Sequence, residues 1–451
     1  MKQTGYAPFI KTKALRICLL AAAAYIGGVQ TGLSQTDAPV PILEKDNPVD
    51  WWFVYKFNAS SFPGCGAPPQ SHPDASQRVC LFGGTVKAYP TFGQQFVFAS
   101  SKNGSLKKGF GCVGGTTTDP LGATFDQIYN GRYYYVIWND QFYRHPQLKA
   151  CGKSASCGAP WGHSKGMLAW NEAGEGLVLQ VTTPSWPAAG SKRFPRKGDG
   201  NTLGCIQNNN LKFAQHFFAL RLIKEDLVTV LKALAHAGVV TDPDNPQLVR
   251  NGGPRDVQDL VEALGTRPDD KKAQPDDDKT APVVKTQPAN GNYTKDELRS
   301  KVILISKPPT LYVPPWQMVS AALGGVALRT ATWWAAPKIY STKKTPDCWG
   351  HQLHPPGPVQ VATTGEWDDT AFKLVGSANH AKIGVSMSGN GHYSIFGDMN
   401  QQGAAMGSGY ECEISQNGRG GLFFVVENPK LFEGITDLIH GDTAPTQPYQ
   451  Y

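Results

Sequence analysis

The sequence contains only one long apolar run, and that run lies at its start. It covers residues 17–29, follows a basic segment, and is too short to span a bilayer comfortably. Small residues in the stretch 32–34 then occupy the positions that a signal peptidase reads. We therefore expect residues 1–34 to be a secretory signal peptide, with Gln35 as the mature start. An N-terminal membrane anchor is the alternative interpretation.

A strong charge of one sign is also missing. The formal net charge is +7, from 43 basic and 36 acidic residues. The expected leader holds four of the basic residues and none of the acidic ones, which leaves 39 against 36, or +3. So weak a field does not by itself indicate a polyanionic partner. Any binding of phosphate must come from locally placed residues.

The sequence has no Cys-x-x-Cys pair, so a zinc site or a thioredoxin-like centre is a poor interpretation. One of the nine cysteines lies in the expected leader, and the even number that remains favours disulfides in an exported protein. Many pairings are open, although Cys151 and Cys157 are close enough to form a small loop. The eight cysteines are Cys65, Cys80, Cys112, Cys151, Cys157, Cys205, Cys348 and Cys412.

Turn-forming residues, by contrast, are abundant, with 49 Gly and 34 Pro. Together with 40% hydrophobic residues, they predict a globular and strand-rich architecture rather than a helical bundle. A length of 451 residues favours two halves. Residues 265–293 are poor in apolar residues and rich in Asp, Lys and Pro, so we predict a linker between halves at 35–264 and 294–451. A functional acidic patch in this stretch is the alternative.

The spacing of hydrophobic residues predicts the secondary-structure elements. Aromatic and β-branched runs predict strands, and apolar residues at helical spacing predict helices. Outside the motifs described next, we predict strands at 49–57, 96–98, 132–138, 326–334 and 422–426. We predict helices at 216–237, 254–264 and 428–438, the last with Asn428 as its N-cap.

A His-x-Lys motif occurs twice, and each copy opens an apolar run. The first run, 163–170, is followed by a turn and a returning strand at 177–181; the second, 380–385, is followed by a return at 393–396. Residues two apart on a strand point to the same face, so each histidine is expected beside its lysine. Polar residues end both units. The candidate site residues are His163, Lys165 and Ser185 in the first unit, and His380, Lys382, Asp398 and Asn400 in the second.

This residue set suits chemistry on a phosphodiester. If the two hairpins are related by a pseudo-twofold axis, both motifs converge on one cleft, where two lysines can bind phosphate oxygens. One imidazole can attack phosphorus while the other protonates the leaving oxygen. Asp398 can fix the tautomer of a neighbouring histidine, and Asn400 can donate to a phosphate oxygen. A single His-x-Lys is more often an ordinary surface pair, but two copies in matching hairpins favour a shared site.

Other candidate residues carry less information. A basic loop with Lys192, Arg193, Arg196 and Lys197 follows the first hairpin, and it is either solvated or a DNA contact. We expect the remaining histidines to be structural or exposed. His351 and His354 have a spacing that can hold a metal, but no carboxylate or cysteine set completes it.

Several motifs taken together resemble the deoxyribonuclease II family, the acid DNases of the phospholipase D superfamily. The resemblance covers most of the chain after the leader. The segments that carry it are Val49-Asp50-Trp51, Val54-Tyr55-Lys56, Trp138-Asn139-Asp140-Gln141, Gly162-His163-Ser164-Lys165-Gly166, Asn201-Thr202-Leu203-Gly204-Cys205, Asn379-His380-Ala381-Lys382 and Gly397-Asp398-Met399-Asn400.

The resemblance implies a mixed α/β fold of two pseudo-twofold-related α-β-α halves. It also implies metal-independent cleavage of DNA at acidic pH through a phosphohistidine, leaving 3′-phosphate ends. His163 would be the nucleophile and His380 the general acid, or the reverse, with Lys165 and Lys382 on the phosphate. An acidic optimum agrees with the ordinary histidine pKa of about 6.5, since one histidine must be protonated. A Cys348–Cys412 disulfide is a further implication.

The sequence departs from the full phospholipase D pattern at two positions. That pattern has an aspartate five residues after each lysine, where this chain has Trp170 and Met387. The difference favours the nuclease branch over a lipase. At the end of the first hairpin Ser185 stands in place of an asparagine.

Two other functions stay open at this stage: a phosphodiesterase acting on lipids or small phosphodiesters, and a catalytically silent relative that binds DNA. For the leading hypothesis DNA is the substrate, and no metal, cofactor or stable membrane association is expected. The leader predicts a secreted or periplasmic protein, with a lysosomal location as the alternative.

Overall fold

The computed structural model describes residues 37–65, 78–79, 85–86, 93–143, 146–195, 212–265, 292–387 and 391–447. Several predictions from the sequence lie outside these residues. They are the leader at 1–34, nearly all of the linker at 265–293, the basic residues Arg196 and Lys197, the segment 201–205, and Cys80 and Cys205.

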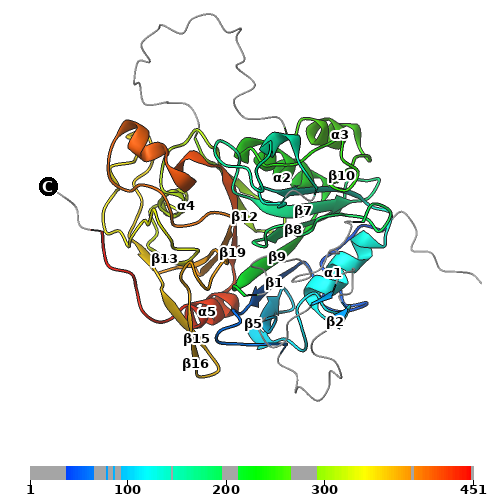
Figure 1. The fold of residues 1–451 in the computed structure, drawn as a ribbon, viewed down its shortest axis with the longest axis horizontal. Coiled ribbons are helices and arrows are strands. Elements are labelled where there is room, and N and C mark those ends of the chain that lie inside the picture. Colours follow the sequence, from blue (N-terminus) through cyan, green and yellow to red (C-terminus); the bar gives the residue numbers. More distant parts are fainter. Residues whose placement is uncertain are drawn as a thin grey trace, which may run out of the picture. The chain divides into compact units, whose positions relative to one another are not determined.

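Strands dominate the chain, and helices occur between or after them (Figure 1). Up to residue 265 the elements are β1 (Trp51–Lys56), β2 (Arg78–Val79), β3 (Thr85–Val86), β4 (Phe96–Ser100), β5 (Asn103–Lys108), α1 (Pro120–Tyr129), β6 (Tyr134–Asn139), β7 (Lys165–Trp170), β8 (Gly176–Val181), β9 (Gln215–Leu222), α2 (Lys224–Ala237), β10 (Val249–Arg250) and α3 (Arg255–Glu262). After residue 292 they are β11 (Thr294–Glu297), β12 (Ile303–Lys307), α4 (Pro315–Ala322), β13 (Leu328–Ala331), β14 (Val359–Val361), β15 (Thr364–Trp367), β16 (Thr370–Lys373), β17 (Ile383–Ser386), β18 (Tyr393–Gly397), β19 (Gly421–Glu427) and α5 (Pro429–Leu438).

Two large sheets repeat one strand order. The eight-stranded sheet runs β10-β6-β7-β8-β9-β1-β4-β5, and the seven-stranded sheet runs β11-β12-β19-β18-β17-β13-β14. Their centres correspond, because β6-β7-β8-β9-β1 and β13-β17-β18-β19-β12 are both antiparallel throughout. The helices correspond as well: α1 and α4 precede β6 and β13, and α2 and α5 follow β9 and β19. The protein is therefore a mixed α/β fold with an internal repeat.

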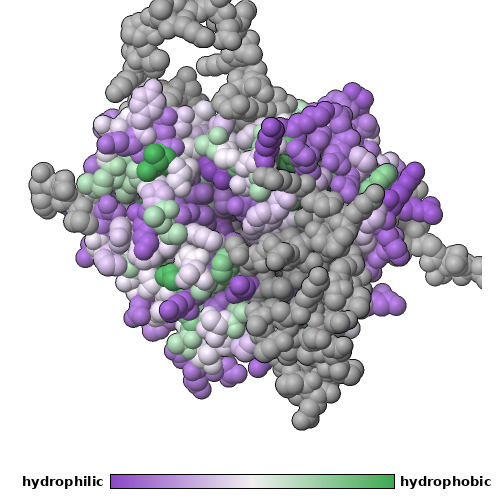
Figure 2. Space-filling model, in the orientation of Figure 1, coloured by the Kyte–Doolittle hydropathy of each residue, from purple (hydrophilic) through white to green (hydrophobic). Residues whose placement is uncertain are grey.

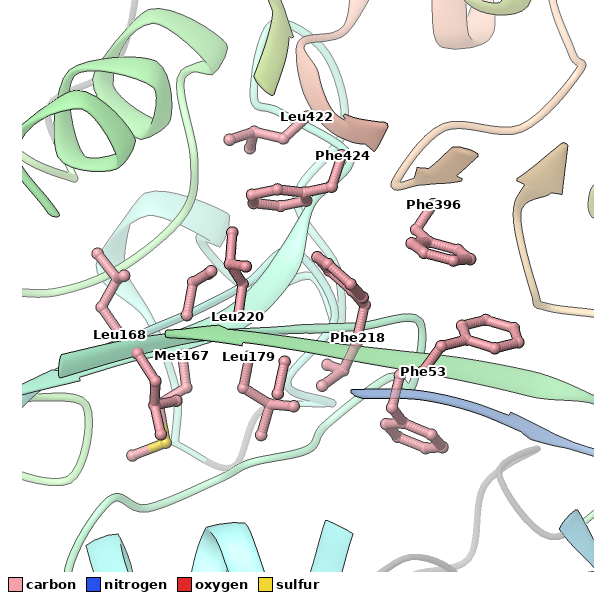
Figure 3. Packing of buried hydrophobic residues seen from close by; sticks show 14 of the residues in the cluster. Phe53, Met167, Leu168, Leu179, Phe218, Leu220, Phe396, Leu422 and Phe424 are labelled. Atoms are coloured by element: carbon pink, nitrogen blue, oxygen red, sulfur yellow. The ribbon is translucent and has the colours of Figure 1, made fainter. Parts of the chain in front are cut away.

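The two sheets share one hydrophobic core. Residues of β1 and β9 meet residues of β18 and β19, and Figure 3 shows this contact between the sheets. The ring of Phe53 stacks on that of Phe396 with centroids 4.5 Å apart, and Phe218 lies 5.5 Å from Phe424. Burying such aromatic rings contributes about 1.5–3 kcal/mol for each side chain. The core thus holds β1 and β9 of the first half against β18 and β19 of the second.

The predicted helix at 216–237 is wrong over its first third. Residues 215–222 form β9, and the helix α2 begins only at Lys224. Leu220, Ile223 and Leu227 do have helical spacing, but Phe217 and Phe218 are buried between β1 and β8 in the middle of the sheet. Pairing on both edges outweighs a local periodicity of this kind. The other predicted helices are present, and the Asn428 side chain caps α5 by accepting from the Leu431 amide.

Both predicted hairpins are present, with later starts than the sequence suggested. The first hairpin is β7–β8 and the second is β17–β18. His163 precedes β7 by two residues, and His380 precedes β17 by three. The histidines therefore lie in the segments that lead into the strands, where neighbouring chains can hold them.

Three disulfides join described cysteines: Cys65–Cys112, Cys151–Cys157 and Cys348–Cys412. The last is the pair that the family resemblance implied. Within the described ranges, no helix is long and apolar enough to cross a bilayer. The face of the molecule in Figure 2 is mostly hydrophilic, with small and scattered hydrophobic groups.

Candidate active site

The backbone of each His-x-Lys motif is held by the opposite half of the chain. The amide of His163 donates to the carbonyl of Gly420, 2.8 Å away, and Gly420 immediately precedes β19. The amide of His380 donates to the carbonyl of Ala214, also at 2.8 Å, and Ala214 immediately precedes β9. The two contacts are equivalent within the repeat. Each motif is therefore held by the residue that immediately precedes β9 or β19 in the other half.

The His163 ring is fixed by a backbone carbonyl. Its Nδ1 lies 2.7 Å from the carbonyl oxygen of Asp398, and because a carbonyl only accepts, Nδ1 carries the proton. In the neutral ring, Nε2 then keeps its lone pair. Burial lowers the pKa of His163 well below its usual value, and the charges of Lys165 and Arg419 lower it further against the opposing effect of Asp140. These contacts and charges favour the neutral ring, with Nε2 as its unprotonated nitrogen.

The His380 ring lies among aromatic side chains. The centroid of Trp333 is 4.2 Å from the imidazole, and that of Phe213 is 4.7 Å away. The Nδ1 atom faces the side-chain amide of Gln215 at 3.4 Å, and Nε2 is buried without a hydrogen-bond partner among the described residues. Burial lowers the pKa of His380 well below its usual value, followed by the charges of Lys382 and Lys165.

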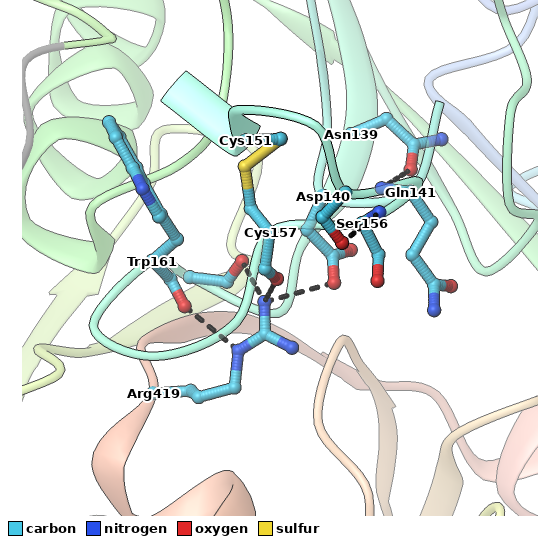
Figure 4. Close-up of a disulfide and its surroundings, with 10 residues drawn as sticks. Asn139, Asp140, Gln141, Cys151, Ser156, Cys157, Trp161 and Arg419 are labelled. Carbon is cyan, nitrogen blue, oxygen red and sulfur yellow. Dashed lines mark hydrogen bonds and ion pairs between the residues drawn. A yellow bond between two sulfur atoms is a disulfide. The ribbon is translucent and has the colours of Figure 1, made fainter. Parts of the chain in front are cut away.

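The lysine of the first motif belongs to a buried charge network. Lys165 Nζ donates to one carboxylate oxygen of Asp140, and Arg419 donates to the other at 2.9 Å. Arg419 also donates to the carbonyls of Trp161 and Cys157, which binds the loop closed by the Cys151–Cys157 disulfide to the second half (Figure 4). Burial alone would raise the pKa of Asp140, but Lys165, His163 and Arg419 outweigh it and hold that pKa well below the usual range.

The lysine of the second motif forms no ion pair with a carboxylate among the described residues, although the charges of Asp398 and Asp140 act on it. Lys382 Nζ donates to the carbonyl of His380, and its amide donates to Nδ1 of His216 at 3.1 Å. Burial lowers the pKa of Lys382 well below its usual value, and the charge of Lys165 adds to this. The charges of both lysines lower the pKa of both histidines, and the charge of Lys165 also lowers the pKa of Lys382. The two motifs share one electrostatic environment.

Asp398 contacts the site in an unexpected way. Its carbonyl, rather than its carboxylate, holds the His163 ring. The carboxylate instead accepts from Ser164 Oγ at 2.6 Å, from Gln180 Nε2 at 3.1 Å and from the Leu422 amide at 3.1 Å. Burial raises the pKa of Asp398 to about 7 despite these donors. The side chain fixes the local backbone, and through it the imidazole.

The repeat reveals an asymmetry between the two motifs. Asn139 is level with Lys165 in the β6–β7 register, and Ala331 is level with Ile383 in the β13–β17 register. By this register Asp140 corresponds to Trp333, and Phe213, two residues before β9, corresponds to Arg419, two residues before β19. An ion pair beside His163 is thus replaced by an aromatic pair beside His380, whose Phe213 and Trp333 rings lie 5.6 Å apart.

The remaining predicted site residues, Asn400, Ser185, Lys192 and Arg193, have hydrogen bonds to partners other than the two His-x-Lys motifs. Asn400 is buried and donates an amide N–H to Gln402 at 2.8 Å. Ser185 is buried and donates to the carbonyl of Phe142; the hairpin registers place Pro184, not Ser185, level with Asn400. Lys192 and Arg193 are exposed, and the Lys192 amide donates to the end of α1 at Tyr129. These hydrogen bonds lead to Phe142 and to α1 rather than to the histidines.

Several site residues were missed by reasoning from the sequence. His216 was the first residue of the wrongly predicted helix and Gln215 immediately preceded it, so their place at the start of β9 was not predicted. Asp140 was part of a quoted motif, but nothing in its spacing indicated a pair with Arg419, 279 residues away. In the part of the chain that is described, no three His, Cys, Asp or Glu side chains form a group that could hold a metal ion.

Comparison with known protein families decides the class of protein. Residues 84–441 match the family described as deoxyribonuclease II, which is well over half of the chain. The chain belongs to the deoxyribonuclease II family. As a member it is a deoxyribonuclease, a hydrolase that acts on phosphodiester bonds. The matched range contains both His-x-Lys motifs, Asp140 and Arg419. No curated protein matches the sequence.

Proposed function

We propose that this deoxyribonuclease cleaves DNA at acidic pH without a divalent metal, through a phosphohistidine on His163, and leaves 3′-phosphate ends. Nε2 of His163 attacks phosphorus while His380 gives a proton to the leaving O5′ oxygen, so the P–O5′ bond breaks as the N–P bond forms. A water molecule then attacks phosphorus, gives its proton to His380, and displaces Nε2. His163 and His380 return to their starting states.

The different partners of the two Nδ1 atoms carry this assignment. The carbonyl of Asp398 accepts from His163 Nδ1, which leaves Nε2 as the free lone pair of the neutral ring. The partner of His380 Nδ1 is an amide, which can present either its NH₂ or its oxygen and so suits a ring that gains and loses a proton. The neighbouring aromatic faces also favour an imidazolium by about 0.5–2 kcal/mol.

The two lysines supply the positive charge that phosphoryl transfer requires. Each ammonium has three N–H groups, and the contacts to Asp140 and to the His380 carbonyl use one group each. The other N–H groups are our candidates for the non-bridging phosphate oxygens, with the second amide N–H of Asn400 beside them. Ser185, Lys192 and Arg193 are proposed only as contacts to more distant parts of a DNA strand.

Acidic pH favours the reaction because His380 must be protonated. Burial and the charges of Lys382 and Lys165 lower its pKa, so the ring is neutral in the free enzyme near pH 7. Acidic solution and the negative charge of a bound phosphate both favour the protonated form. The proposed attack uses His163 in its neutral form, which burial and the charges of Lys165, Arg419 and Lys382 favour against the opposing effect of Asp140.

The test is nicking of a supercoiled plasmid at about pH 5, below the ordinary histidine pKa, in the presence of EDTA. We expect wild-type nicking to persist, and His163→Ala and His380→Ala to lose it by at least about 100-fold. His351→Ala is the matched control, since this histidine is exposed. Primer extension from the nicks should require prior removal of a 3′-phosphate. Loss of wild-type nicking in EDTA, or nicks that extend directly, would contradict the proposal.

The repeat also supports a phospholipase D-like arrangement, in which a pseudo-twofold axis relates the halves at about 35–264 and 294–451. The supporting observations are the common strand order and the reciprocal bonds from the two histidine amides. We propose in addition that the leader directs export to a secreted, periplasmic or lysosomal location. N-terminal sequencing of the mature protein should begin at Gln35; a chain that still begins at Met1 would contradict this.

A further inference from the structure

Two fully buried lysines occupy equivalent places in the repeat, outside the His-x-Lys motifs. Lys56 is the last residue of β1, and Lys307 is the last residue of β12. Both have no exposed surface. Within the described residues neither forms an ion pair with a carboxylate. A buried ammonium costs several kcal/mol of desolvation, and an apolar side chain of similar size would avoid that cost.

Lys56 is directed at the loop that precedes β9. Its Nζ donates to the carbonyl of Phe213 at 2.8 Å and to that of Phe57, its own neighbour, at 3.1 Å. The next peptide in this loop holds the second motif, because the Ala214 carbonyl accepts from the His380 amide. The Phe213 side chain also packs against the His380 ring.

Lys307 makes the same arrangement in the other half. Its Nζ donates to the carbonyls of Asn417 at 2.7 Å and Arg419 at 2.8 Å, and to its own neighbour Pro308 at 3.3 Å. Three acceptors match the three N–H groups of an ammonium. The next peptide after Arg419 is that of Gly420, whose carbonyl accepts from the His163 amide.

We propose that Lys56 and Lys307 are positioning residues, each of which fixes the loop that holds the histidine of the opposite half. Lys56 sets the place of His380 and Lys307 sets the place of His163. Neither lysine touches the substrate. The effect is specific to one histidine in each half, because the ammonium binds the carbonyl of Phe213 or of Arg419, and the next carbonyl in the same loop accepts from one histidine amide.

The packing around Gly420 supports the proposed role of Lys307. A Cβ added there would lie 2.1 Å from the carbonyl oxygen of Ala237 and 2.8 Å from that of Lys307. The loop that carries Gly420 therefore packs closely between α2 and β12, and Lys307 binds the carbonyls of residues that precede Gly420. This loop has little conformational freedom unless these hydrogen bonds are removed.

The inference rests on the proposed roles of the two histidines, and the experiment separates them. Wild type, Lys56→Met, Lys307→Met, His380→Ala and His163→Ala are assayed on DNA and on a nitrophenyl ester of a nucleoside 3′-phosphate. The nitrophenolate leaves without a proton, so loss of the general acid should spare the first turnover of the ester, which releases nitrophenolate, whereas loss of the nucleophile should abolish both reactions. Lys224→Met is the matched control, because this lysine is partly exposed in a surface ion pair.

We expect each lysine variant to reproduce, more weakly, the profile of the histidine it supports. Lys56→Met should lower kcat on DNA by about 10- to 100-fold and change the first-turnover release of nitrophenolate little, while Lys307→Met should lower both, since misplacement of about 1 Å can cost 100-fold. Lys56→Gln, which keeps two N–H donors, should recover part of the loss. If the two lysine variants give the same profile, their role is merely structural and the inference fails.

Hydrogen exchange gives a readout that does not depend on chemistry. Lys56→Met should increase exchange of the His380 amide and leave that of His163 unchanged; Lys307→Met should do the reverse. If the histidine variants do not separate the two substrates, the proposed catalytic roles fail, while the exchange pattern still tests the lysines. Unchanged protection of both amides, or equal loss at both, would overturn the positioning inference. Should a Met variant fail to fold, the corresponding Gln variant carries the same comparison.

Discussion

Asp140→Asn is the substitution whose consequences follow most directly from the structure. Asp140 is completely buried and accepts from Lys165 and Arg419, whose side chains are 4% and 11% exposed. The substitution preserves size and one acceptor oxygen but removes the only negative charge among these three side chains. Two buried positive charges would then face each other without compensation.

The expected cost is large because the charges are buried. Removing one partner of a buried ion pair costs about 3–5 kcal/mol, and the oxygen that Asn keeps places the expected value near the lower figure. Asp256→Asn is the matched control. Asp256 pairs with Lys224 at 3.1 Å, but the two side chains are 54% and 39% exposed, so the control should cost no more than about 1 kcal/mol.

The pH dependence provides a second check on the same variant. The folded pKa of Asp140 is depressed, so its contribution to stability is complete above the unfolded carboxyl pKa of about 3.9 and is lost as the pH falls towards the folded value. The difference in unfolding free energy between wild type and Asp140→Asn should therefore be constant from pH 7 to 5 and shrink below about 4. The network stays charged at the acidic pH proposed for catalysis.

Urea denaturation followed by tryptophan fluorescence measures these free energies, with plasmid nicking on the same samples. We expect Asp140→Asn to be less stable than Asp256→Asn by at least about 2 kcal/mol and to nick DNA more slowly, because Lys165 loses its fixed position. Equal stability of the two variants across this pH range would refute the reasoning that Asp140 compensates Lys165 and Arg419.

Three further predictions follow from the site and its surroundings. Lys382→Met removes a charge that lowers the pKa of His380, so the pH above which kcat/KM declines should move upward even though kcat falls. A decline at the same pH as in wild type, or at a lower pH, would contradict this. Because the pKa of Asp398 is raised to about 7, its protonated side chain stabilises the fold below about pH 4, and this stabilisation is lost between pH 4 and 7. The melting temperature of Asp398→Asn should therefore change less over that range than that of wild type, and an equal pH dependence in both would contradict the prediction. Replacing Cys348 and Cys412 by Ser opens a loop with a sequence separation of 64 and should cost about 4 kcal/mol in urea denaturation, whereas a loss under 1 kcal/mol would show that the crosslink adds little.

The sequence predicted the elements that have a strong local pattern. The aromatic run around Trp51 is β1, and both hairpins and the capped helix at Asn428 are present. The helix predicted from residue 216 was wrong over its first third because apolar residues at helical spacing continue across the change from β9 to α2 at Ile223. Local spacing contains no information about which strands flank a segment, and those neighbours decide its conformation.

The candidate site could be predicted only in part, for a similar reason. The repeated His-x-Lys pattern is visible in the chain, so four candidate residues could be named from it. The partners of those residues are set by register and by loops from the opposite half. Phe213 reaches the His380 ring from the first half, and Arg419 reaches Asp140 from the second. These two pairs are 167 and 279 residues apart in the sequence, and no short motif encodes such contacts.

The most direct test of the account is to identify the covalent intermediate. Wild-type enzyme is mixed with a short DNA duplex at about pH 5, quenched in alkali, which preserves phosphohistidine, and digested for mass spectrometry. The account predicts a 3′-nucleotidyl phosphate on His163, present in wild type and absent from His163→Asn. A nucleotide on His380 would reverse the two roles. Rapid cleavage with no adduct on either histidine would contradict a covalent mechanism altogether.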